Sequence, residues 1–355
     1  VRQDGRPTLV VSRDEGPVVL LAEAEGQVVD WTFPPGVVAT SSGAARVLDP
    51  SSLPEQMEVA VQASTPGAGT SRRTVILRTV DAFAPPPLGT DSDGDGVLDE
   101  DEPRGDADQN GIEDAYDPWP LPNVLPFVEG VIGPDVVEAT AGVSAVLGPV
   151  ARRSGARAAG VEPGAVRVQD EWQPMGLYVD VIATELARPR QAVSFVHPTR
   201  VPLPAGAGVR VLAGAAWFDF VTAGSDAVAS APDVRGACPP PESVAYVTGL
   251  TVDHTCVRVT VSDGGPNDAD GAANREISAL YGLALAPVAA PPGDGEGAPA
   301  APIAGECTCR DAELQRGHAL SMALGFGLFC LVLARRRLGR DRLVPVPSRA
   351  RKRRY

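Results

Sequence analysis

Alternating apolar and polar positions predict short β-strands along most of this chain. In residues 1–83 the candidate strands are Val18–Leu21, Gln27–Phe33, Met57–Ala63 and Thr74–Val80. In the third of these, Met57, Val59 and Val61 share one face and polar residues occupy the other, as in a half-buried strand. Clusters of Ser, Gly and Pro separate the strands and mark turns. The pattern predicts a β-sandwich module over residues 1–83.

A second β-rich region is expected over residues 121–284. In the segment from Leu177 to Ala183 the alternation places Leu177, Val179 and Val181 on one inward face. The segment Val257–Val261 alternates more regularly still. We therefore expect a mainly β protein: β-sandwich modules with a loop segment between them at residues 84–120.

The apolar pattern changes near the C-terminus. Residues 285–317 are rich in Pro, Ala and Gly and predict an extended spacer. Residues 318–334 then form an uncharged apolar run, which predicts one C-terminal transmembrane helix, although its length is marginal for a span. Because arginines follow at once, the tail 335–355 is expected in the cytoplasm and the rest outside. The alternative, a buried core helix, fits this arginine cluster poorly.

Charge separates the tail from the body. The net charge of the 355 residues is −14, but the tail 335–355 carries +9, which leaves −23 on the remainder. An acidic body of this size repels nucleic acid and suits divalent cations. We therefore expect no nucleic-acid partner.

Much of the acidity lies in two twelve-residue loops in the segment 91–117. Both loops place oxygen-bearing side chains at positions 1, 3, 5, 9 and 12, a backbone carbonyl at position 7, and Gly at position 6. Calcium takes six to eight oxygens, and this spacing turns alternate side chains toward one centre. The expected ligands are Asp91, Asp93, Asp95, Val97, Asp99 and Glu102 in the first loop, and Asp106, Asp108, Asn110, Ile112, Asp114 and Asp117 in the second.

Prolines flank and separate the loops, so the helices of an EF-hand are not expected. Tandem loops of this kind resemble thrombospondin type 3 calcium repeats, and the resemblance implies a chain that wraps directly around Ca²⁺. The alternative is a solvated acidic linker, but two copies in register, each with its glycine, favour calcium. Calcium would then stiffen a hinge between the flanking β domains.

Two resemblances concern the β regions. The strand spacing of residues 1–83 resembles immunoglobulin-like or PKD-like extracellular domains, with Trp31 as a core residue. Residues 121–284 resemble the bacterial choice-of-anchor U domain in the strand Val257–Val261 and the Gly/Asp-rich turn after it, although they depart from that family after Asn274. In this turn Asp263, Asp268 and Asp270 are candidates for a third calcium site. With only three acidic residues close together, a turn whose aspartates cap their own backbone is favoured.

The cysteines suggest export. Cys238 and Cys256 flank the candidate strand Val244–Thr248 and are expected to form a disulfide. Cys307 and Cys309 precede the apolar run, an order that resembles MYXO-CTERM-like sorting signals. That resemblance implies export, processing near the cysteine pair and retention at the cell surface. The polar spacer before the helix and the long basic tail depart from it, so retention as a membrane span stays open.

No catalytic constellation is visible. The three histidines belong to no metal-protease, nucleophile-elbow or nucleotide-binding motif. We therefore expect a non-enzymatic, exported and cell-surface-anchored calcium-binding protein with a structural or adhesive role. Its partner would be a surface protein or polysaccharide. The rival hypothesis is the C-terminal part of an exported hydrolase whose catalytic domain lies upstream of residue 1.

Overall fold

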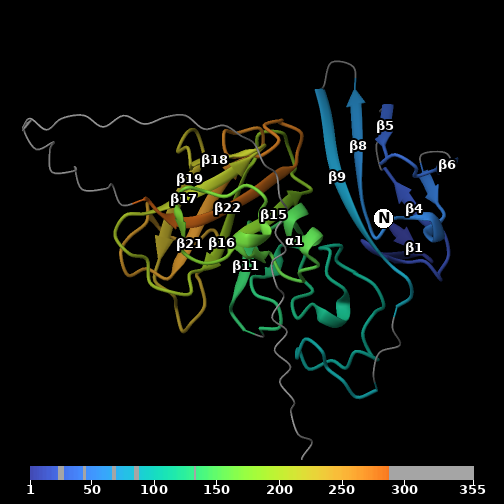
Figure 1. The fold of residues 1–355 in the computed structure, drawn as a ribbon, viewed down its shortest axis with the longest axis horizontal. Helices are drawn as coiled ribbons and strands as arrows, with labels where there is room; N and C mark the ends of the chain where they lie inside the picture. The colour runs from blue at the N-terminus through green and yellow to red at the C-terminus, as the bar shows by residue number, and fades with distance from the viewer. Residues whose placement is uncertain (23–27, 43–44, 66–68, 84–87, 132, 288–355) are drawn as a thin grey trace, which may run out of the picture. The chain divides into compact units, whose positions relative to one another are not determined.

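The computed structural model describes residues 1–22, 28–42, 45–65, 69–83, 88–131 and 133–287. These residues form mainly β-strands arranged in several sheets, which confirms the predicted class (Figure 1). The helices among them are short: α1 (Pro149–Ser154) and the 3₁₀ turns η1 (Pro50–Ser52), η2 (Asp114–Tyr116) and η3 (Pro163–Ala165).

Residues 1–80 form two sheets. One has the strand order β2 (Arg6–Pro7), β1 (Arg2–Gln3), β4 (Val18–Leu21), β7 (Ala45–Leu48) and β6 (Ala39–Ser42). The other has the order β3 (Val10–Ser12), β9 (Gly69–Val80), β8 (Gln56–Thr65) and β5 (Val28–Thr32), with β8 and β9 as a long antiparallel hairpin (Figure 1).

Side chains from both sheets build one hydrophobic core. Leu20 of β4 is buried in it. Met57 and Val59 of β8 are also buried in it, as the alternation predicted, while Val61 and Trp31 pack against it and are partly buried. The four predicted strands are present. The sequence did not reveal the other strands of these sheets, which have two to four residues each and show no clear periodicity, whereas the equally short Val18–Leu21 is apolar throughout.

Residues 124–285 form two further sheets. One has the order β10 (Val124–Pro126), β11 (Val136–Ala139), β16 (Ala192–Pro198), β21 (Cys256–Ser262), β19 (Ala227–Ala231) and β20 (Val247–Thr248). The other has the order β12 (Ser144–Leu147), β15 (Tyr178–Thr184), β22 (Ile277–Leu285), β17 (Ala207–Ala213) and β18 (Ala216–Asp219), with β13 (Gly160–Val161) beside β15 and β14 (Gln173–Pro174) beside β22.

The alternation predicted for two of these strands has different outcomes. In β21 the side chains of Val257, Val259 and Val261 are buried in the shared core, as predicted. In β15 Val179 and Val181 also face that core, but every residue of the strand is buried. The first two sheets cover the opposite face of β15, where Ile182 packs in their hydrophobic cluster.

The two β regions therefore touch each other. Ile76 of β9 belongs to the same hydrophobic cluster as Ile182 and Val146, and the backbone N–H of Thr74 donates to the Glu276 carboxylate over 2.6 Å. By their contacts residues 1–290 form one unit.

Among the described residues no helix is both long enough and apolar enough to cross a membrane. The predicted helix 318–334 and the basic tail 335–355 lie outside the described residues, as do Cys307, Cys309 and nearly all of the spacer 285–317.

Candidate metal centre

The first acidic loop brings its alternate carboxylates together. Oxygens of Asp91, Asp93 and Asp95 lie within 4.8 Å of one another. The loop is closed by hydrogen bonds to the first of these: the two Asp91 oxygens accept from the backbone N–H groups of Gly94 (2.6 Å) and Gly96 (3.2 Å). The spacing thus has the local consequence expected of it, which is a turn that gathers oxygen atoms.

The two loops have the same conformation. In each, the N–H of position 6 donates to the side chain at position 1, that of position 5 to position 3, and that of position 7 to position 5. The N–H of position 2 donates to the side chain at position 9, whose own N–H donates to the carbonyl preceding the loop. The glycines at position 6 agree as well, with φ of 98° at Gly96 and 96° at Gly111. The sequence repeat is therefore a structural repeat.

Three carboxylate oxygens of this segment are buried and accept no hydrogen bond from the described residues: Asp93 Oδ2, Glu102 Oε2 and Asp114 Oδ2. Burial, reinforced by neighbouring aspartates, raises the pKa of Glu102 to about 7. Burial likewise raises the pKa of Asp93, and that of Asp114 to about 6. Buried anionic oxygens without donors are suited to a hard cation, and an all-oxygen donor set is the one that Ca²⁺ prefers.

The second loop is more deeply buried than the first. Asp106 and Asn110 are 0% and 1% exposed, and Asp117 is also buried. Asn110 Nδ2 donates to Asp117 Oδ2 (2.6 Å) and to Asp108 Oδ2 (3.1 Å), which joins positions 3, 5 and 12 of this loop. Burial raises the pKa of Asp117 to about 7 and that of Asp106 well above its usual range.

The second loop also contacts both β regions. Asp106 Oδ2 accepts from the Leu9 N–H over 3.2 Å, and the Asn110 carbonyl accepts from the Leu147 N–H over 2.9 Å. The buried Arg152 lies against this loop, since a Cβ on Gly111 would be 1.9 Å from Arg152 Nη2. Arg152 Nη1 donates to the Ile76 carbonyl of β9. Sequence reasoning missed Leu9, Leu147 and Arg152, because no local pattern connects them to the loop.

The third candidate group is organised differently. All six carboxylate oxygens of Asp263, Asp268 and Asp270 accept hydrogen bonds, six of the seven donors being backbone N–H groups and the seventh the amide of Asn274. This is the arrangement expected of aspartates that hold a tight turn.

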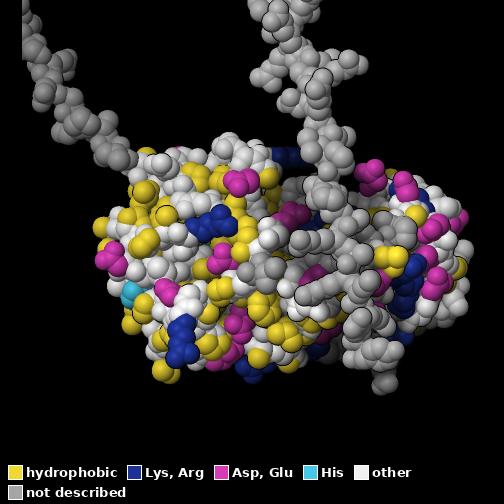
Figure 2. Space-filling model, turned by 90° about the horizontal axis from the view of Figure 1, so that it is seen from below, with side chains coloured by type: hydrophobic (Ala, Val, Ile, Leu, Met, Phe, Trp, Pro, Cys, Tyr) yellow, Lys and Arg dark blue, Asp and Glu magenta, His cyan; other side chains and the backbone are white. Residues whose placement is uncertain are grey.

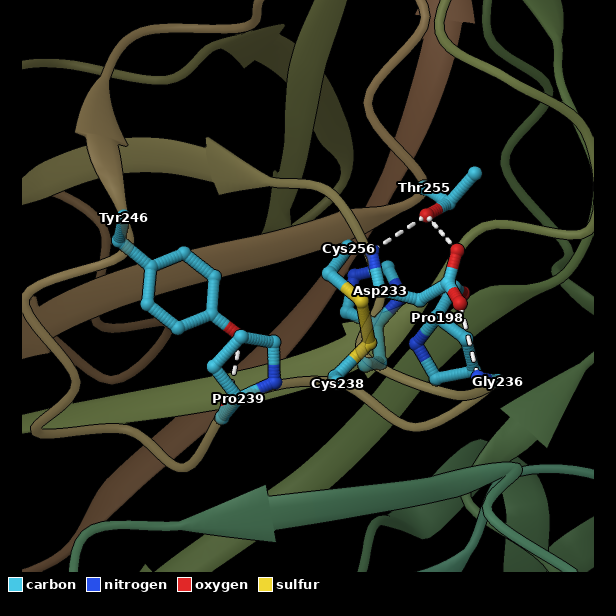
Figure 3. The surroundings of a disulfide bond; sticks show 9 residues. Pro198, Asp233, Gly236, Cys238, Pro239, Tyr246, Thr255 and Cys256 are labelled. Atoms are coloured by element: carbon cyan, nitrogen blue, oxygen red, sulfur yellow. Dashed lines mark hydrogen bonds between the residues drawn. A yellow bond between two sulfur atoms is a disulfide. The ribbon is translucent and has the colours of Figure 1, made fainter.

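Cys238 and Cys256 form a disulfide, which joins the loop after β19 to the start of β21 (Figure 3). Next to it the Tyr246 hydroxyl donates to the Pro239 carbonyl over 2.7 Å, and Thr255 Oγ1 donates to Asp233. The strand predicted between the two cysteines is shorter than expected, because only Val247–Thr248 pairs with β19.

The two described histidines have structural surroundings. His197 is buried between the rings of Phe127 and Tyr281, and burial lowers its pKa to about 4. His254 Nδ1 lies 2.9 Å from the Ser230 hydroxyl. In the part of the chain that the structure describes, neither ring has a hydrogen bond to a carboxylate.

Comparison of the chain with protein-family models, with curated proteins and with solved structures finds no match. The resemblances inferred from sequence motifs therefore stay predictions.

Proposed function

We propose that this chain is an exported, cell-surface-anchored calcium-binding protein with a structural or adhesive role. The observation that carries the proposal is the repeated loop: two segments with the same spacing of oxygen ligands, the same hydrogen-bond pattern and the same glycine conformation. An acidic linker has no physical reason to adopt one closed conformation twice, whereas a cation site needs it to position its ligands.

Calcium is the favoured cation for two reasons. The donors are carboxylate, amide and backbone oxygens without sulfur or imidazole, which disfavours Zn²⁺ and Cu²⁺. Each twelve-residue loop with Gly at position 6 also offers more protein oxygens than Mg²⁺ usually binds, because Mg²⁺ keeps several of its water ligands. Asp91, Asp93, Asp95, Asp99 and Glu102, with the Val97 carbonyl, would hold one ion. The equivalent residues of the second loop would hold the next.

A role without catalysis is supported by the other polar groups. The two described histidines, His197 and His254, are packed as core and turn residues, and the aspartates of the turn 263–270 accept hydrogen bonds from the backbone. On the face shown in Figure 2, acidic, basic and apolar side chains are interspersed rather than gathered into a field of one sign. We propose a surface protein or a polysaccharide as the partner. The spacer 285–317 would hold the β domains of this chain at a distance from the membrane.

Calorimetric titration of the full chain with CaCl₂ tests the proposal. We expect saturable binding of at least two ions, in the range of about 0.1–1 mM that is typical of extracellular modules. The matched control is a double variant, Asp93→Asn with Asp108→Asn, which changes position 3 of both loops and should abolish the heat of binding. Absence of binding by the unmodified chain would refute calcium as the ligand.

Surface anchoring needs a separate test. Cys307→Ser and Cys309→Ser variants can be compared with the unmodified chain by fractionation of the producing cells and by protease accessibility on intact cells. Surface retention of the unmodified chain and its loss in the variants would support sorting at the cysteine pair. Retention of all forms would leave the apolar run 318–334 as the anchor, and a cytosolic location of all forms would refute export.

A further inference from the structure

The two loops differ in how far they are built into the protein. Asp106 and Ile112 of the second loop are both 0% exposed. At the equivalent positions of the first loop Asp91 is exposed and Val97 is 42% exposed. Loops of the same conformation therefore occupy different surroundings.

Their hydrogen bonds differ in the same sense. The second loop receives the Leu9 N–H on Asp106 and the Leu147 N–H on Asn110, one from each β region. In the described part of the chain, the hydrogen bonds of the first loop stay within residues 90–101. Separation of the two β regions would therefore break the second loop and leave the first intact.

The two loops differ in their contact with arginine side chains. The Arg152 guanidinium lies against Gly111, where a Cβ would be 1.9 Å from Nη2, whereas a Cβ on Gly96 would meet nothing within 4 Å. Arg152 offsets part of the acidic charge of the second loop when no metal is bound. The first loop has no ion pair with any described arginine, so its carboxylates repel one another until a cation binds.

We infer that the loops are metal sites of different kinds: the second is a structural site that clamps the two β regions together, and the first is a peripheral site whose ion exchanges freely. This inference rests on the proposed calcium binding and assigns a different role to each of the two sites. Removal of calcium opens residues 90–102 first, whereas residues 105–117 stay closed until the two β regions separate.

Hydrogen exchange of the full chain, measured by mass spectrometry in CaCl₂ and in excess chelator, tests this directly. We expect chelation to increase exchange at residues 90–102 by at least about tenfold and to change residues 105–117 by less than about threefold, since a buried loop opens only with the surrounding fold. Equal deprotection of both loops, or stronger deprotection of the second, would overturn the inference.

A matched pair of variants gives a second readout. Asp91→Asn and Asp106→Asn make the same change at position 1 of each loop. We expect Asp91→Asn to remove one binding event and to leave the thermal midpoint within about 2 °C, and Asp106→Asn to lower the midpoint by more than about 5 °C. Equal shifts in the two variants would overturn the inference.

Because Asp106→Asn could prevent folding, Asp93→Asn and Asp108→Asn provide a milder pair at position 3. Here we expect Asp93→Asn to lose the weaker calcium-binding event, which belongs to the first loop, and Asp108→Asn to lose the tighter one, which belongs to the second loop. Two ions of equal affinity that exchange at equal rates would overturn this inference alone. No uptake by the unmodified chain would overturn the proposed function with it.

Discussion

The contact between Arg152 and the second loop allows a quantitative comparison of two glycines. Gly96 and Gly111 occupy position 6 of their loops with φ of 98° and 96°, so Gly→Ala imposes the same backbone strain on both. An L-residue in this region costs about 1–2 kcal/mol. At Gly96 the added methyl group meets open space, so this is the whole expected cost.

At Gly111 the methyl group would lie 1.9 Å from Arg152 Nη2 and 2.6 Å from Cζ, so the guanidinium must move. Movement breaks its hydrogen bond to the Ile76 carbonyl, which is the one hydrogen bond this buried guanidinium makes within the described residues. Loss of a hydrogen bond made by a charged group costs about 1.5–3 kcal/mol. Gly111→Ala should therefore lose about 2 kcal/mol more of the free energy of unfolding than Gly96→Ala.

Urea unfolding and thermal unfolding followed by circular dichroism, in chelator and in CaCl₂, measure this difference. For a unit of this size a loss of 1 kcal/mol lowers the thermal midpoint by about 2 °C, so the thermal midpoints of the two variants should differ by about 4 °C. In an Arg152→Met background the difference should nearly vanish, because the obstructing guanidinium is gone. Equal destabilisation by the two alanines in the original background would refute the contact.

Three further predictions concern other parts of the molecule. Joint replacement of Cys238 and Cys256 by Ala should cost about 3 kcal/mol, the loop entropy of an eighteen-residue separation, in urea unfolding under oxidising conditions, and an unchanged midpoint would contradict it. The raised pKa values of Glu102 and Asp117, both about 7, mean that the folded, metal-free chain binds more protons than the unfolded chain. Its stability in chelator should therefore fall as pH rises from about 5 to 8, and a midpoint that is constant or rises would contradict this. Asp170→Asn should cost about 1.5–3 kcal/mol, because the Asp170 carboxylate pairs at 2.8 Å with the buried Arg210 guanidinium, which keeps its second pair with Asp219, and an unchanged stability would contradict it.

The sequence by itself determined the features that depend on neighbours along the chain. The oxygen ligands and the glycine of each acidic loop lie within twelve residues, so their spacing alone predicts a closed turn, and both loops are closed. The strand Val257–Val261 was also predictable, because one of its faces packs on a core and the period of two is visible in the residues. The strand Val18–Leu21 was predictable as a short, continuous apolar run.

Only the tertiary structure decided what the loops contact. Leu9, Leu147 and Arg152 are distant from one another in sequence, and Arg152 belongs to a six-residue helix whose two adjacent arginines read as surface charge. The burial of both faces of β15 also depends on the tertiary structure. Ile182 on its outer face is buried because it packs in the hydrophobic cluster of the first two sheets. Local periodicity reports the side of an element that faces a core, whereas contacts between distant segments depend on how complete sheets pack, and no window of sequence contains that information.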